Sequence, residues 1–395
     1  MKRILFVHQV SVVGGASYCM LSILKGIDRD FFEPVVALRQ EGPLADEIRR
    51  LNIEVLIFDG MQTVPYNKSF LHYKTIYSYA KVTRVQEKFA KLLKTSRIDV
   101  VYLNNMMLYP YLKTAKMCGC KTIIHVREHW PENEHQIQMN FARKVVKQYS
   151  DAVLAINRYS ASMFPECADK TTIVYDWIDL KNRYEKVDFD KIFDESTENL
   201  KIILFTGGLA RIKGTLEVIR LFSNKILGEE YRLLLMGAGL DYRFTGLSGK
   251  IKKILVRIGV KPYGFKVVEA IKKDYRVRVV PATYNIVDYV KKSYCVISYF
   301  TIPHANLGMA EAIELGTIVI APKTDEAIEY SNNGEAALLY TLKDEEDLIR
   351  KFNYMVNNYE QVKDRVLTNS DAIQNMFSPE ANIKRLNTVC KSICG

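Results

Sequence analysis

The feature that most constrains the fold is a repeated alternation of short β-branched runs with longer stretches whose apolar residues recur at helical spacing. It starts at residue 3, breaks once near residue 180 and starts again after residue 200. Such alternation predicts mostly parallel sheets covered by helices on both faces. We therefore expect an α/β fold with two doubly wound, Rossmann-like lobes, for which 395 residues are sufficient.

The expected elements follow directly from this pattern. Predicted strands of the first half are 3–8, 33–38, 53–58, 99–103, 121–126, 152–156 and 171–175, and predicted helices are 15–27, 43–51, 70–96, 107–118 and 137–149. In the second half we expect strands 201–206, 231–236, 276–280, 295–299 and 317–321, with helices 214–226, 285–292 and 306–315.

The break in the alternation predicts the domain organisation. Residues 181–200 are polar and rich in charge, which is typical of a linker. We expect a first lobe over residues 1–180, a linker over 181–200 and a second lobe over 201–375. Ligands of open α/β sheets bind beyond the carboxyl ends of the strands, so a cleft between the two lobes is the expected site.

The charge of the chain needs an explanation. A formal net charge of +11 favours an anionic partner such as nucleic acid, an acidic membrane surface or a phosphorylated substrate. No aromatic platform or recognition motif accompanies the basic residues, so we expect no nucleic-acid partner. No apolar run approaches the roughly 20 residues that span a bilayer, and the apolar start at Ile4–Val7 fits a buried strand better than a signal peptide.

The seven cysteines are odd in number and scattered. Cys118-Gly-Cys120 lacks the two-residue spacer of a redox or zinc pair, and no second pair complements it. A reduced chain is the simpler interpretation. We therefore expect a cytoplasmic protein, either free or peripheral on the inner face of the cell membrane.

One segment of the second half, residues 250–273, is strongly basic. Its cations include Lys250, Lys252, Lys253 and Arg257, and isoleucine and leucine recur among them at helical spacing. One interpretation is a surface helix with solvated lysines. The other is an interfacial helix in which these four residues contact anionic lipid headgroups.

The first candidate for chemistry is the run Phe205–Gly214. A strand ends in Gly207 and Gly208, and the cations Arg211 and Lys213 follow before a helix begins. Two glycines permit positive φ and close approach of a ligand to the backbone, and the cations suit phosphate oxygens. The alternative is an ordinary tight turn with two solvated cations.

The second candidate is the run Pro303–Gly316. Asn306 is a good N-cap residue, so a helix should begin at Leu307 with free N–H groups suited to a diphosphate. His304 lies just before this helix, and Glu311 lies just over one turn inside it. A carboxylate there suits the two hydroxyls of a ribose, although an isolated glutamate on a helix is more commonly a solvated surface residue.

Together these two runs resemble the donor site of the family-4 retaining glycosyltransferases (glycosyl transferases group 1), which have the GT-B fold. Gly207-Gly208-Leu209, three residues and Lys213-Gly214 match the family pattern Gly-Arg-Leu, three residues, Lys-Gly. The resemblance implies that Lys213 neutralises the leaving diphosphate. The family arginine falls on Gly208, and Arg211 is the candidate to replace it.

The family also carries two glutamates with seven residues between them. Glu311 matches the second glutamate, whose implied role is to bind ribose, and the first falls on Pro303. Pro303-His304 resembles a Pro-His version of the motif that keeps only the second glutamate. His304 is then a candidate to face the transferred sugar, and N–H groups near Asn306 and Leu307 are expected to bind the leaving diphosphate.

The resemblance extends over nearly the whole chain. It implies that the first lobe is the acceptor side, that the second lobe binds the nucleotide sugar, and that a final helix over 376–395 returns to the first lobe. The matching segments are Gly14-Gly15-Ala16 as a donor-binding glycine loop, Tyr175–Asp179 at the end of the first lobe, Glu329 five residues before Gly334 as a donor-binding glutamate, and Phe377–Glu380 at the start of the final helix.

The reactive corner expected in the first lobe is Ile124–His129. The family usually has a histidine at the end of this strand, near the transferred sugar. Arg127 takes that position here, with His125 two residues earlier on the same strand face. We expect Arg127 or Glu128 in the cleft, and His125 is either a second reactive group or a hydrogen-bonded histidine of the core.

The implied reaction moves a sugar from a nucleoside-diphosphate sugar to a hydroxyl of a saccharide acceptor, with retention at the anomeric carbon. Such a hexosyltransferase would need no metal or other cofactor, and the sequence has no Asp-x-Asp motif or histidine cluster with ligand spacing. The acceptor expected from the basic segment is lipid-linked, as in capsule or other surface polysaccharide assembly. A nucleotide-sugar epimerase of the same fold and a non-catalytic binding protein with a decayed site remain the alternatives.

Overall fold

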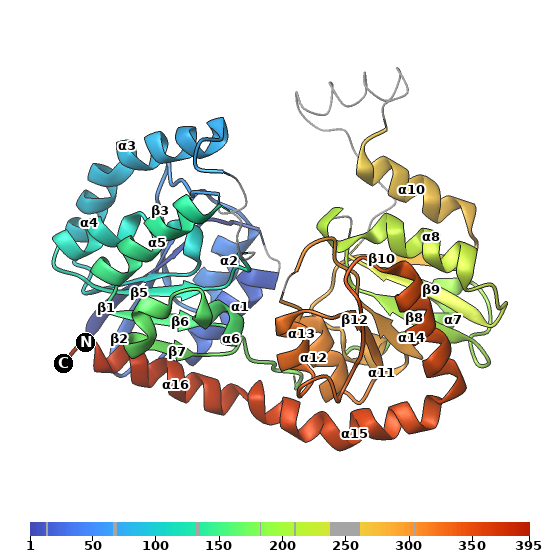
Figure 1. Cartoon of the computed structure of the whole chain (residues 1–395). Helices are drawn as coiled ribbons and strands as arrows, with labels where there is room; N and C mark the ends of the chain where they lie inside the picture. The colour runs from blue at the N-terminus through green and yellow to red at the C-terminus, as the bar shows by residue number, and fades with distance from the viewer. Residues whose placement is uncertain are drawn as a thin grey trace. The chain divides into compact units, whose positions relative to one another are not determined.

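A computed structural model of the chain describes residues 1–12, 15–65, 69–130, 135–181, 183–208, 211–237, 261–303 and 305–395 (Figure 1). The chain forms two structural units. The first unit is Met1–Trp177 with Phe377–Gly395, and the second unit is Ile178–Met376.

The first unit is built on a sheet of seven parallel strands in the order β3-β2-β1-β4-β5-β6-β7. The strands are β1 (Lys2–His8), β2 (Phe32–Leu38), β3 (Glu54–Ile57), β4 (Val100–Leu103), β5 (Lys121–Val126), β6 (Ala152–Ala155) and β7 (Thr171–Ile173). All seven strands predicted in the first half are confirmed, with ends that differ by one or two residues.

Helices cover both faces of this sheet. They are α1 (Gly15–Gly26), α2 (Pro43–Arg50), α3 (Tyr73–Thr95), η1 (Met106–Leu108), α4 (Tyr111–Met117), α5 (Gln136–Tyr149), α6 (Arg158–Ser162), η2 (Pro165–Lys170) and α16 (Pro379–Ser392). The helices α3, α4 and α5 pack on one face, whereas α1, α2 and α16 pack on the other (Figure 1).

The strand β1 explains why the sheet is parallel and buried. Its residues Ile4–Val7 are all inaccessible to solvent, and they alternate between the two core clusters on opposite faces of the sheet. A continuous apolar run of this kind is stable only when helices cover both faces. A helix therefore has to follow most strands along the chain, so that both faces of the sheet are covered.

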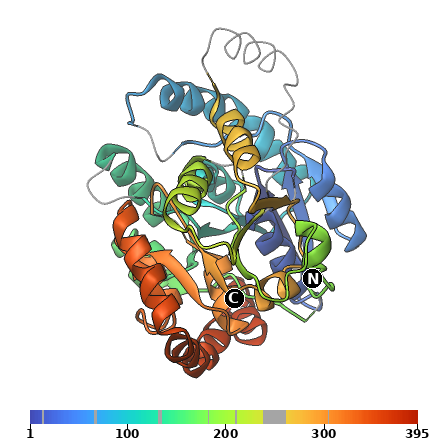
Figure 2. The ribbon, with the colours of Figure 1, turned by 90° about the vertical axis from the view of Figure 1, so that its right-hand side faces the viewer.

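The second unit is built on a sheet of six parallel strands in the order β10-β9-β8-β11-β12-β13. The strands are β8 (Lys201–Phe205), β9 (Tyr231–Met236), β10 (Val277–Val280), β11 (Cys295–Ile297), β12 (Val319–Pro322) and β13 (Leu338–Tyr340). Its described helices are α7 (Phe189–Phe193), η3 (Arg211–Lys213), α8 (Thr215–Lys225), α10 (Tyr263–Lys273), α11 (Val287–Lys291), α12 (Leu307–Glu314), α13 (Asp325–Tyr330), α14 (Glu345–Asn357) and α15 (Tyr359–Met376). Figure 2 shows α8 and α10 side by side on this unit.

The polar segment that suggested a linker is part of the second unit. Phe189 and Phe193 of α7 are buried, and Glu195 forms an ion pair with the buried Arg232 of β9. The backbone N–H of Val187 donates to the carboxylate of Asp288 at 2.6 Å. The apolar side chains of α7, the ion pair of Glu195 and the hydrogen bond to Asp288 therefore attach this segment to the second unit.

The chain ends on the first unit. Ser378 caps α16 by accepting a hydrogen bond from Ala381 N–H at 3.3 Å, and Pro379 occupies the first helical position. The carboxamide of Asn382 accepts from Tyr175 N–H at 3.1 Å and donates to Ser378 O at 2.9 Å. Leu386 and Cys390 then complete one face of the first core.

Two further observations bear on the expectations for the whole chain. Among the helices that the structure describes, none is long and apolar enough to cross a lipid bilayer. All seven cysteines are described, and none of them forms a disulfide.

Candidate functional site

The loop that follows β8 is tightly folded around its two glycines. Gly208 has a φ of +63°, which favours glycine, and its N–H donates to Met236 O at 3.2 Å. A Cβ on Gly207 would lie 2.2 Å from the ring of Phe205 and 3.0 Å from Lys213 Cβ. Any larger residue at position 207 would therefore have to displace the Phe205 ring, and it would also crowd Lys213.

Lys213 is a half-buried cation that has no counterion among the residues that the structure describes. Its amine lies 4.3 Å from the centre of the Phe300 ring, and no hydrogen bond or ion pair joins it to another described residue. Burial lowers the pKa of Lys213 to about 8. Arg211 occupies the same turn, η3, but is exposed. A desolvated cation with no partner at the end of a strand is typical of an anion-binding site.

The first turn of α12 lies against this loop. A Cβ on Gly308 would be 3.5 Å from Thr206 Oγ1, and Thr301 N–H donates to Ile212 O at 2.9 Å. Asn306 caps the helix by accepting from Met309 N–H, and its amide donates to Ser298 Oγ at 2.6 Å. The two motifs singled out in the sequence therefore meet at the carboxyl ends of β8 and β11.

Glu311 is buried on α12 and forms an ion pair with Arg183. The guanidinium of Arg183 also donates to Tyr284 O at 2.9 Å and lies 4.6 Å from the centre of the Tyr284 ring. Burial raises the pKa of Glu311, and the charge of Arg183 opposes that shift. The alternative of a solvated glutamate on a helix surface is therefore wrong.

A second carboxylate lies one turn further along α12. Burial, followed by the charge of Glu311, raises the pKa of Glu314 to about 7. Glu329 is also buried, on α13, which packs against α12. The second unit therefore gathers buried acidic groups along α12 and α13, and the charge of Arg183 acts on both Glu311 and Glu314.

The reactive corner of the first unit is a buried polar network. Tyr102 hydroxyl lies 2.6 Å from His125 Nδ1, and Arg127 Nη2 lies 3.2 Å from the same nitrogen. Burial and then the charge of Arg127 lower the pKa of His125 well below its usual value. His125 is thus a neutral, hydrogen-bonded histidine of the core, which is one of the two interpretations of the sequence.

Arg127 and Glu128 are engaged in the same network. Arg127 forms an ion pair with Asp176, and only 8% of its side chain is exposed. Glu128 accepts from the backbone N–H groups of Met106 at 2.9 Å and Arg127 at 3.1 Å. These contacts orient the end of β5, so within the first unit both side chains hold the backbone in place.

Sequence comparison identifies no relative: no protein-family model and no curated protein matches the chain. Comparison with solved structures finds proteins of similar fold. Anabaena HepE in complex with UDP-glucose superposes with a TM-score of 0.73 at 18% identity, over 99% of this chain and 100% of that protein.

The chain has the GT-B fold. A glycosyltransferase from Rickettsia africae has a TM-score of 0.70 at 15% identity, over 100% of this chain and 98% of that protein. A putative UDP-N-acetylglucosamine 2-epimerase from Listeria monocytogenes has a TM-score of 0.59 at 14% identity, over 99% of this chain and 96% of that protein. At identities this low, the structural similarity establishes the GT-B architecture of the chain alone, and the chemistry must be argued from its residues.

Some predicted site residues of this GT-B chain lie outside the described residues. They are Gly14, His304, Lys250, Lys252, Lys253 and Arg257. Gly15 is described and begins α1, where it is exposed and a Cβ would meet no atom within 4 Å. Among the described residues, no group of three or more His, Cys, Asp or Glu side chains is arranged to hold a metal ion.

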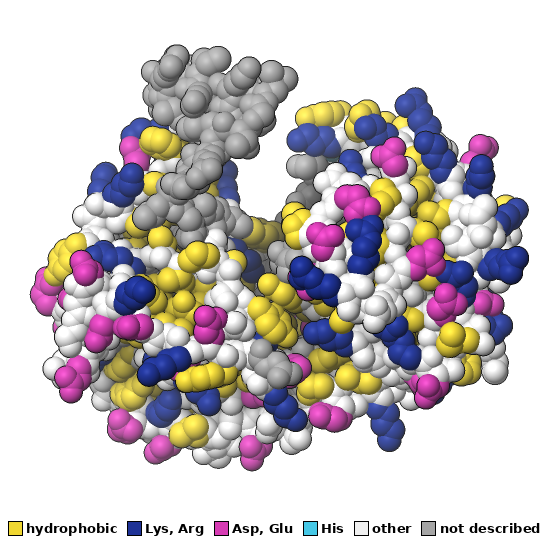
Figure 3. Space-filling view, turned by 180° about the vertical axis from the view of Figure 1, so that it is seen from behind, with side chains coloured by type: hydrophobic (Ala, Val, Ile, Leu, Met, Phe, Trp, Pro, Cys, Tyr) yellow, Lys and Arg dark blue, Asp and Glu magenta, His cyan; other side chains and the backbone are white. Residues whose placement is uncertain are grey.

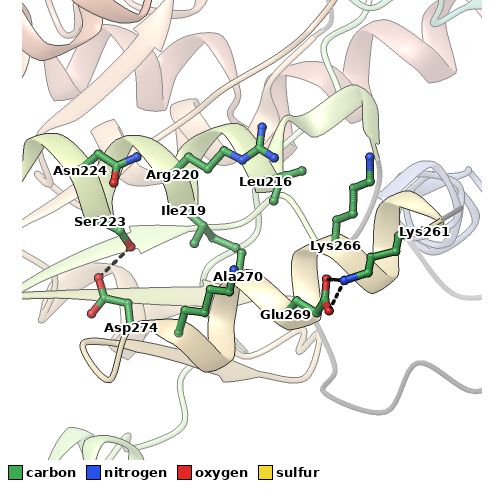
Figure 4. A pocket seen from close by; sticks show the side chains of 11 residues that line it. Leu216, Ile219, Arg220, Ser223, Asn224, Lys261, Lys266, Glu269, Ala270 and Asp274 are labelled. Atoms are coloured by element: carbon green, nitrogen blue, oxygen red, sulfur yellow. Dashed lines mark hydrogen bonds and ion pairs between the residues drawn. The ribbon is translucent and has the colours of Figure 1, made fainter. Parts of the chain in front are cut away.

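A groove of about 550 Å³ lies between α8 and α10 on the second unit (Figure 4). Lys261 Nζ donates to Glu269 at 2.6 Å at one end of the groove, and Ser223 of α8 donates to Asp274 at 2.7 Å at the other end. Lys213, Asn306 and Glu311 do not line this groove. It is therefore separate from the arrangement at the strand ends.

Sequence reasoning missed two groups that the structure places beside predicted ones. Arg183 lay in the segment interpreted as a linker, so its contact with Glu311 had no local signal. His8 is buried at the end of β1, where its Nδ1 lies 3.0 Å from Asn104 Nδ2 and its Nε2 lies 3.4 Å from Ser17 Oγ. Burial, with the charge of Arg127, lowers the pKa of His8 to about 3.

Proposed function

We propose that this protein is a retaining glycosyltransferase of family 4. It would transfer a sugar from a nucleoside-diphosphate sugar to a hydroxyl of a saccharide acceptor. The observation that carries the proposal is that Lys213, the start of α12 and Glu311 lie close together beyond the carboxyl ends of β8 and β11. They provide a cation, free helix N–H groups and a buried carboxylate, which are the groups that a diphosphate and a ribose require.

Lys213 would act on the leaving diphosphate. As the glycosidic bond breaks, negative charge accumulates on the phosphate oxygens, and a preorganised cation stabilises this charge more in the transition state than in the ground state. The amine of Lys213 is already partly desolvated and has no protein partner among the described residues. Little of its interaction with phosphate would therefore be lost to competing protein contacts.

The start of α12 would bind the same diphosphate from another side. Leu307 and Gly308 provide N–H groups in the first helical turn, and the cap formed by Asn306 leaves those two groups available to a ligand. Arg211 is exposed on the neighbouring turn and would add a second cation in place of the family arginine. With these charges supplied by the protein, we propose that donor binding requires no divalent metal.

Glu311 would hold the ribose of the donor. An ionised carboxylate accepts two hydrogen bonds from adjacent hydroxyls, and the contact with Arg183 favours the ionised form against the effect of burial. Glu329, Gly207 and Gly208 would complete the donor site, and His304 would face the sugar in the Pro-His version of the motif. Gly14 and Gly15 would contribute from the first unit.

The acceptor in this proposal is a lipid-linked saccharide of surface polysaccharide assembly. The proposal is supported by the net charge of +11, which favours a chain that works beside an anionic surface. The enzyme would be cytoplasmic and peripheral on the inner face of the cell membrane. The first unit would then receive the acceptor, with Arg127 and His125 setting the shape of the acceptor side.

The likeness to an epimerase structure supports one alternative, a nucleotide-sugar epimerase. An assay of the purified protein with a panel of nucleoside-diphosphate sugars and a membrane extract separates the two. A transferase releases nucleoside diphosphate and glycosylates the extract, with a product anomer that matches the donor by NMR. Conversion of the donor to a stereoisomer without any acceptor would instead establish the epimerase, and Lys213→Ala should strongly reduce either turnover.

A further inference from the structure

The first unit carries large apolar side chains on its surface at the beginnings of two neighbouring helices. They are Leu71, Tyr73, Ile76 and Tyr77 at the start of α3, and Ile137 and Phe141 at the start of α5. Their exposed fractions lie between 45% and 77%. Large aliphatic and aromatic groups this exposed are unusual when they gather in one place.

The two groups of side chains are close to one another. The ring of Tyr79 on α3 lies 6.0 Å from that of Phe141 on α5, and Phe70 contacts both rings at 5.5 Å and 6.5 Å. The helices α3, α4 and α5 cover the same face of the first sheet (Figure 1). Phe70, Tyr79 and Phe141 therefore join the beginnings of α3 and α5, and we call the exposed apolar residues at these two beginnings the apolar patch of the first unit.

The fold itself does not need the apolar patch. The face of α3 that enters the core is formed by Thr75, Val82, Phe89 and Leu93. Tyr73 and Tyr77 lie on the opposite face and Ile76 lies at its side, where soluble helices normally present polar residues. Beyond residue 80 the same outer face is polar and basic, so its apolar character is confined to the first turns.

Cations lie along the two helices that carry the apolar patch. Six basic residues and one acidic residue lie on α3, and three basic residues and no acidic residue lie on α5; the basic residues are Lys74, Lys81, Arg84, Lys88, Lys91 and Lys94, with Arg143, Lys144 and Lys147. The amine of Lys81 lies 4.4 Å from the centre of the Tyr77 ring, and that of Lys74 lies 5.8 Å from the Tyr73 ring. Hydrophobic side chains and Lys or Arg side chains alternate at the top of this unit in Figure 3.

We propose that the apolar patch and the cations of α3 and α5 dock this protein on an anionic lipid bilayer. Leucine, isoleucine and phenylalanine would enter the boundary between headgroups and acyl chains, and the tyrosines would remain at headgroup depth. The lysines and arginines would pair with acidic headgroups, because long basic side chains keep their charge in water while their stems cover apolar surface.

The charge of this surface favours a bilayer over a second copy of the chain. In a symmetric dimer through the apolar patch, the basic residues of α3 and α5 would face the same cations of the partner, which is repulsive. An anionic membrane offers complementary charge and an apolar layer together. Docking through this surface fits the lipid-linked acceptor of the proposed function, but its test does not depend on sugar transfer.

The test is co-sedimentation of the full chain with vesicles of phosphatidylcholine alone or mixed with phosphatidylglycerol. The wild-type protein should bind the mixed vesicles, and binding should fall as salt is raised. Tyr73→Ser/Ile76→Ser/Tyr77→Ser should weaken binding at least about tenfold. Lys88→Gln/Lys91→Gln/Lys94→Gln should weaken it further, by about fivefold for each cation that contacts the surface.

Two matched variants of the second unit serve as controls. Leu227→Ser/Tyr354→Ser removes equally exposed apolar groups, and Lys266→Gln/Lys272→Gln/Lys273→Gln removes cations of α10. Both controls should bind vesicles as the wild type does, and all variants should keep the wild-type thermal unfolding midpoint.

Three results would overturn the proposal. The first is that the wild type does not bind anionic vesicles, and the second is that the α10 variant loses as much vesicle binding as the α3 variants. The third is that the wild type is a dimer in solution without lipid, whereas Tyr73→Ser/Ile76→Ser/Tyr77→Ser is a monomer.

Discussion

Arg183 and Glu311 form a buried ion pair, although they lie 128 positions apart in the chain. Glu311 belongs to the helix that follows β11, whereas Arg183 comes from the segment that precedes β8. The arginine is itself held by Tyr284, through a hydrogen bond to the backbone oxygen and contact with the ring. The ribose carboxylate of the proposed donor site is therefore oriented by a side chain outside both sequence motifs.

Removing Arg183 should weaken donor binding and make it dependent on pH. Without the guanidinium, burial alone acts on Glu311, and its pKa rises further. A protonated Glu311 cannot accept two ribose hydrogen bonds, so Arg183→Met should raise the KM for the donor by about tenfold with a smaller change in kcat. In this variant kcat/KM should also increase with pH through the range in which Glu311 ionises.

The matched control for Arg183→Met is Arg183→Lys, which keeps a positive charge beside Glu311. It should recover most of the donor affinity and a wild-type pH profile. If Arg183→Met lowered kcat and left both the KM and the pH profile unchanged, Arg183 would not act through Glu311.

The activity should decline in alkaline solution because of Lys213. Burial lowers the pKa of its amine to about 8 in the free protein, so the cation is lost above that pH. The value of kcat/KM should therefore fall about tenfold per pH unit above the pKa of Lys213. Lys213→Arg should remove this decline because a guanidinium stays charged, whereas Lys213→Ala should lower kcat by about 10²–10³-fold.

An alkaline limb in kcat/KM that persists unchanged in Lys213→Arg would assign the titration to another group. Lys225→Arg is the matched control for the substitution itself. The exposed Lys225 forms an ion pair with Glu346 at 3.3 Å, away from the proposed site. Its replacement should leave the pH profile as in the wild type.

Glu314 should make the protein less stable as the pH rises. Its folded-state pKa is raised to about 7, above the usual value of about 4.3, so the native state retains a proton that the unfolded chain has released. Stability contributed by this proton is lost as the pH rises through about 7. Glu314→Gln cannot ionise, and it should be more stable than the wild type by about 1–2 kcal/mol at alkaline pH.

The measurement is urea unfolding of both proteins at acidic and alkaline pH, followed by circular dichroism. The advantage of Glu314→Gln should disappear near the pKa of a free glutamate. The exposed Glu346→Gln is the control and should change stability equally at both values. An equal gain for Glu314→Gln at both pH values would show that its effect is unrelated to ionisation.

The ion pair between Arg127 and Asp176 should stabilise the first unit. Both side chains are largely buried, so Asp176→Asn leaves an unpaired charge inside the protein. The free energy of unfolding of the first unit should fall by about 3–5 kcal/mol, and Arg127→Met in the same chain should restore part of that loss. Lys116→Met, which breaks the more exposed pair with Asp151, should cost less than about 1 kcal/mol.

Additive losses in the Arg127 and Asp176 double variant would mean that the two side chains are not energetically coupled. The comparison is made by urea denaturation of the four proteins of the cycle. An unfolding free energy of Asp176→Asn equal to that of the wild type would contradict the importance of the pair.

The sequence was most informative where local pattern determines structure. Continuous apolar runs such as Ile4–Val7 are stable only as buried parallel strands, so the sheets and their order along the chain could be predicted. The strand β13 and the helices α7, α13, α14 and α15 were not predicted, and α7 lies in the segment that was expected to be a linker.

The candidate site shows the same division. The turn at Gly207–Lys213 and the cap at Asn306 are encoded locally, and both were placed correctly on strand and helix ends. The partner of Glu311 could not be found, because an ion pair between Arg183 and a residue 128 positions away leaves no local pattern. The exposed apolar residues of α3 were likewise hidden, since only the structure shows which face of a helix is free.

The most direct test of the central proposal is calorimetric titration of the purified protein with a panel of nucleoside-diphosphate sugars. We predict that one donor binds the wild type without added metal, that Lys213→Ala and Glu311→Ala each weaken its binding at least about tenfold, and that the control variant Lys225→Ala/Glu346→Ala binds as the wild type does. Failure of every donor to bind, or equal affinity in the wild type, Lys213→Ala and Glu311→Ala, would contradict the assignment of the donor site.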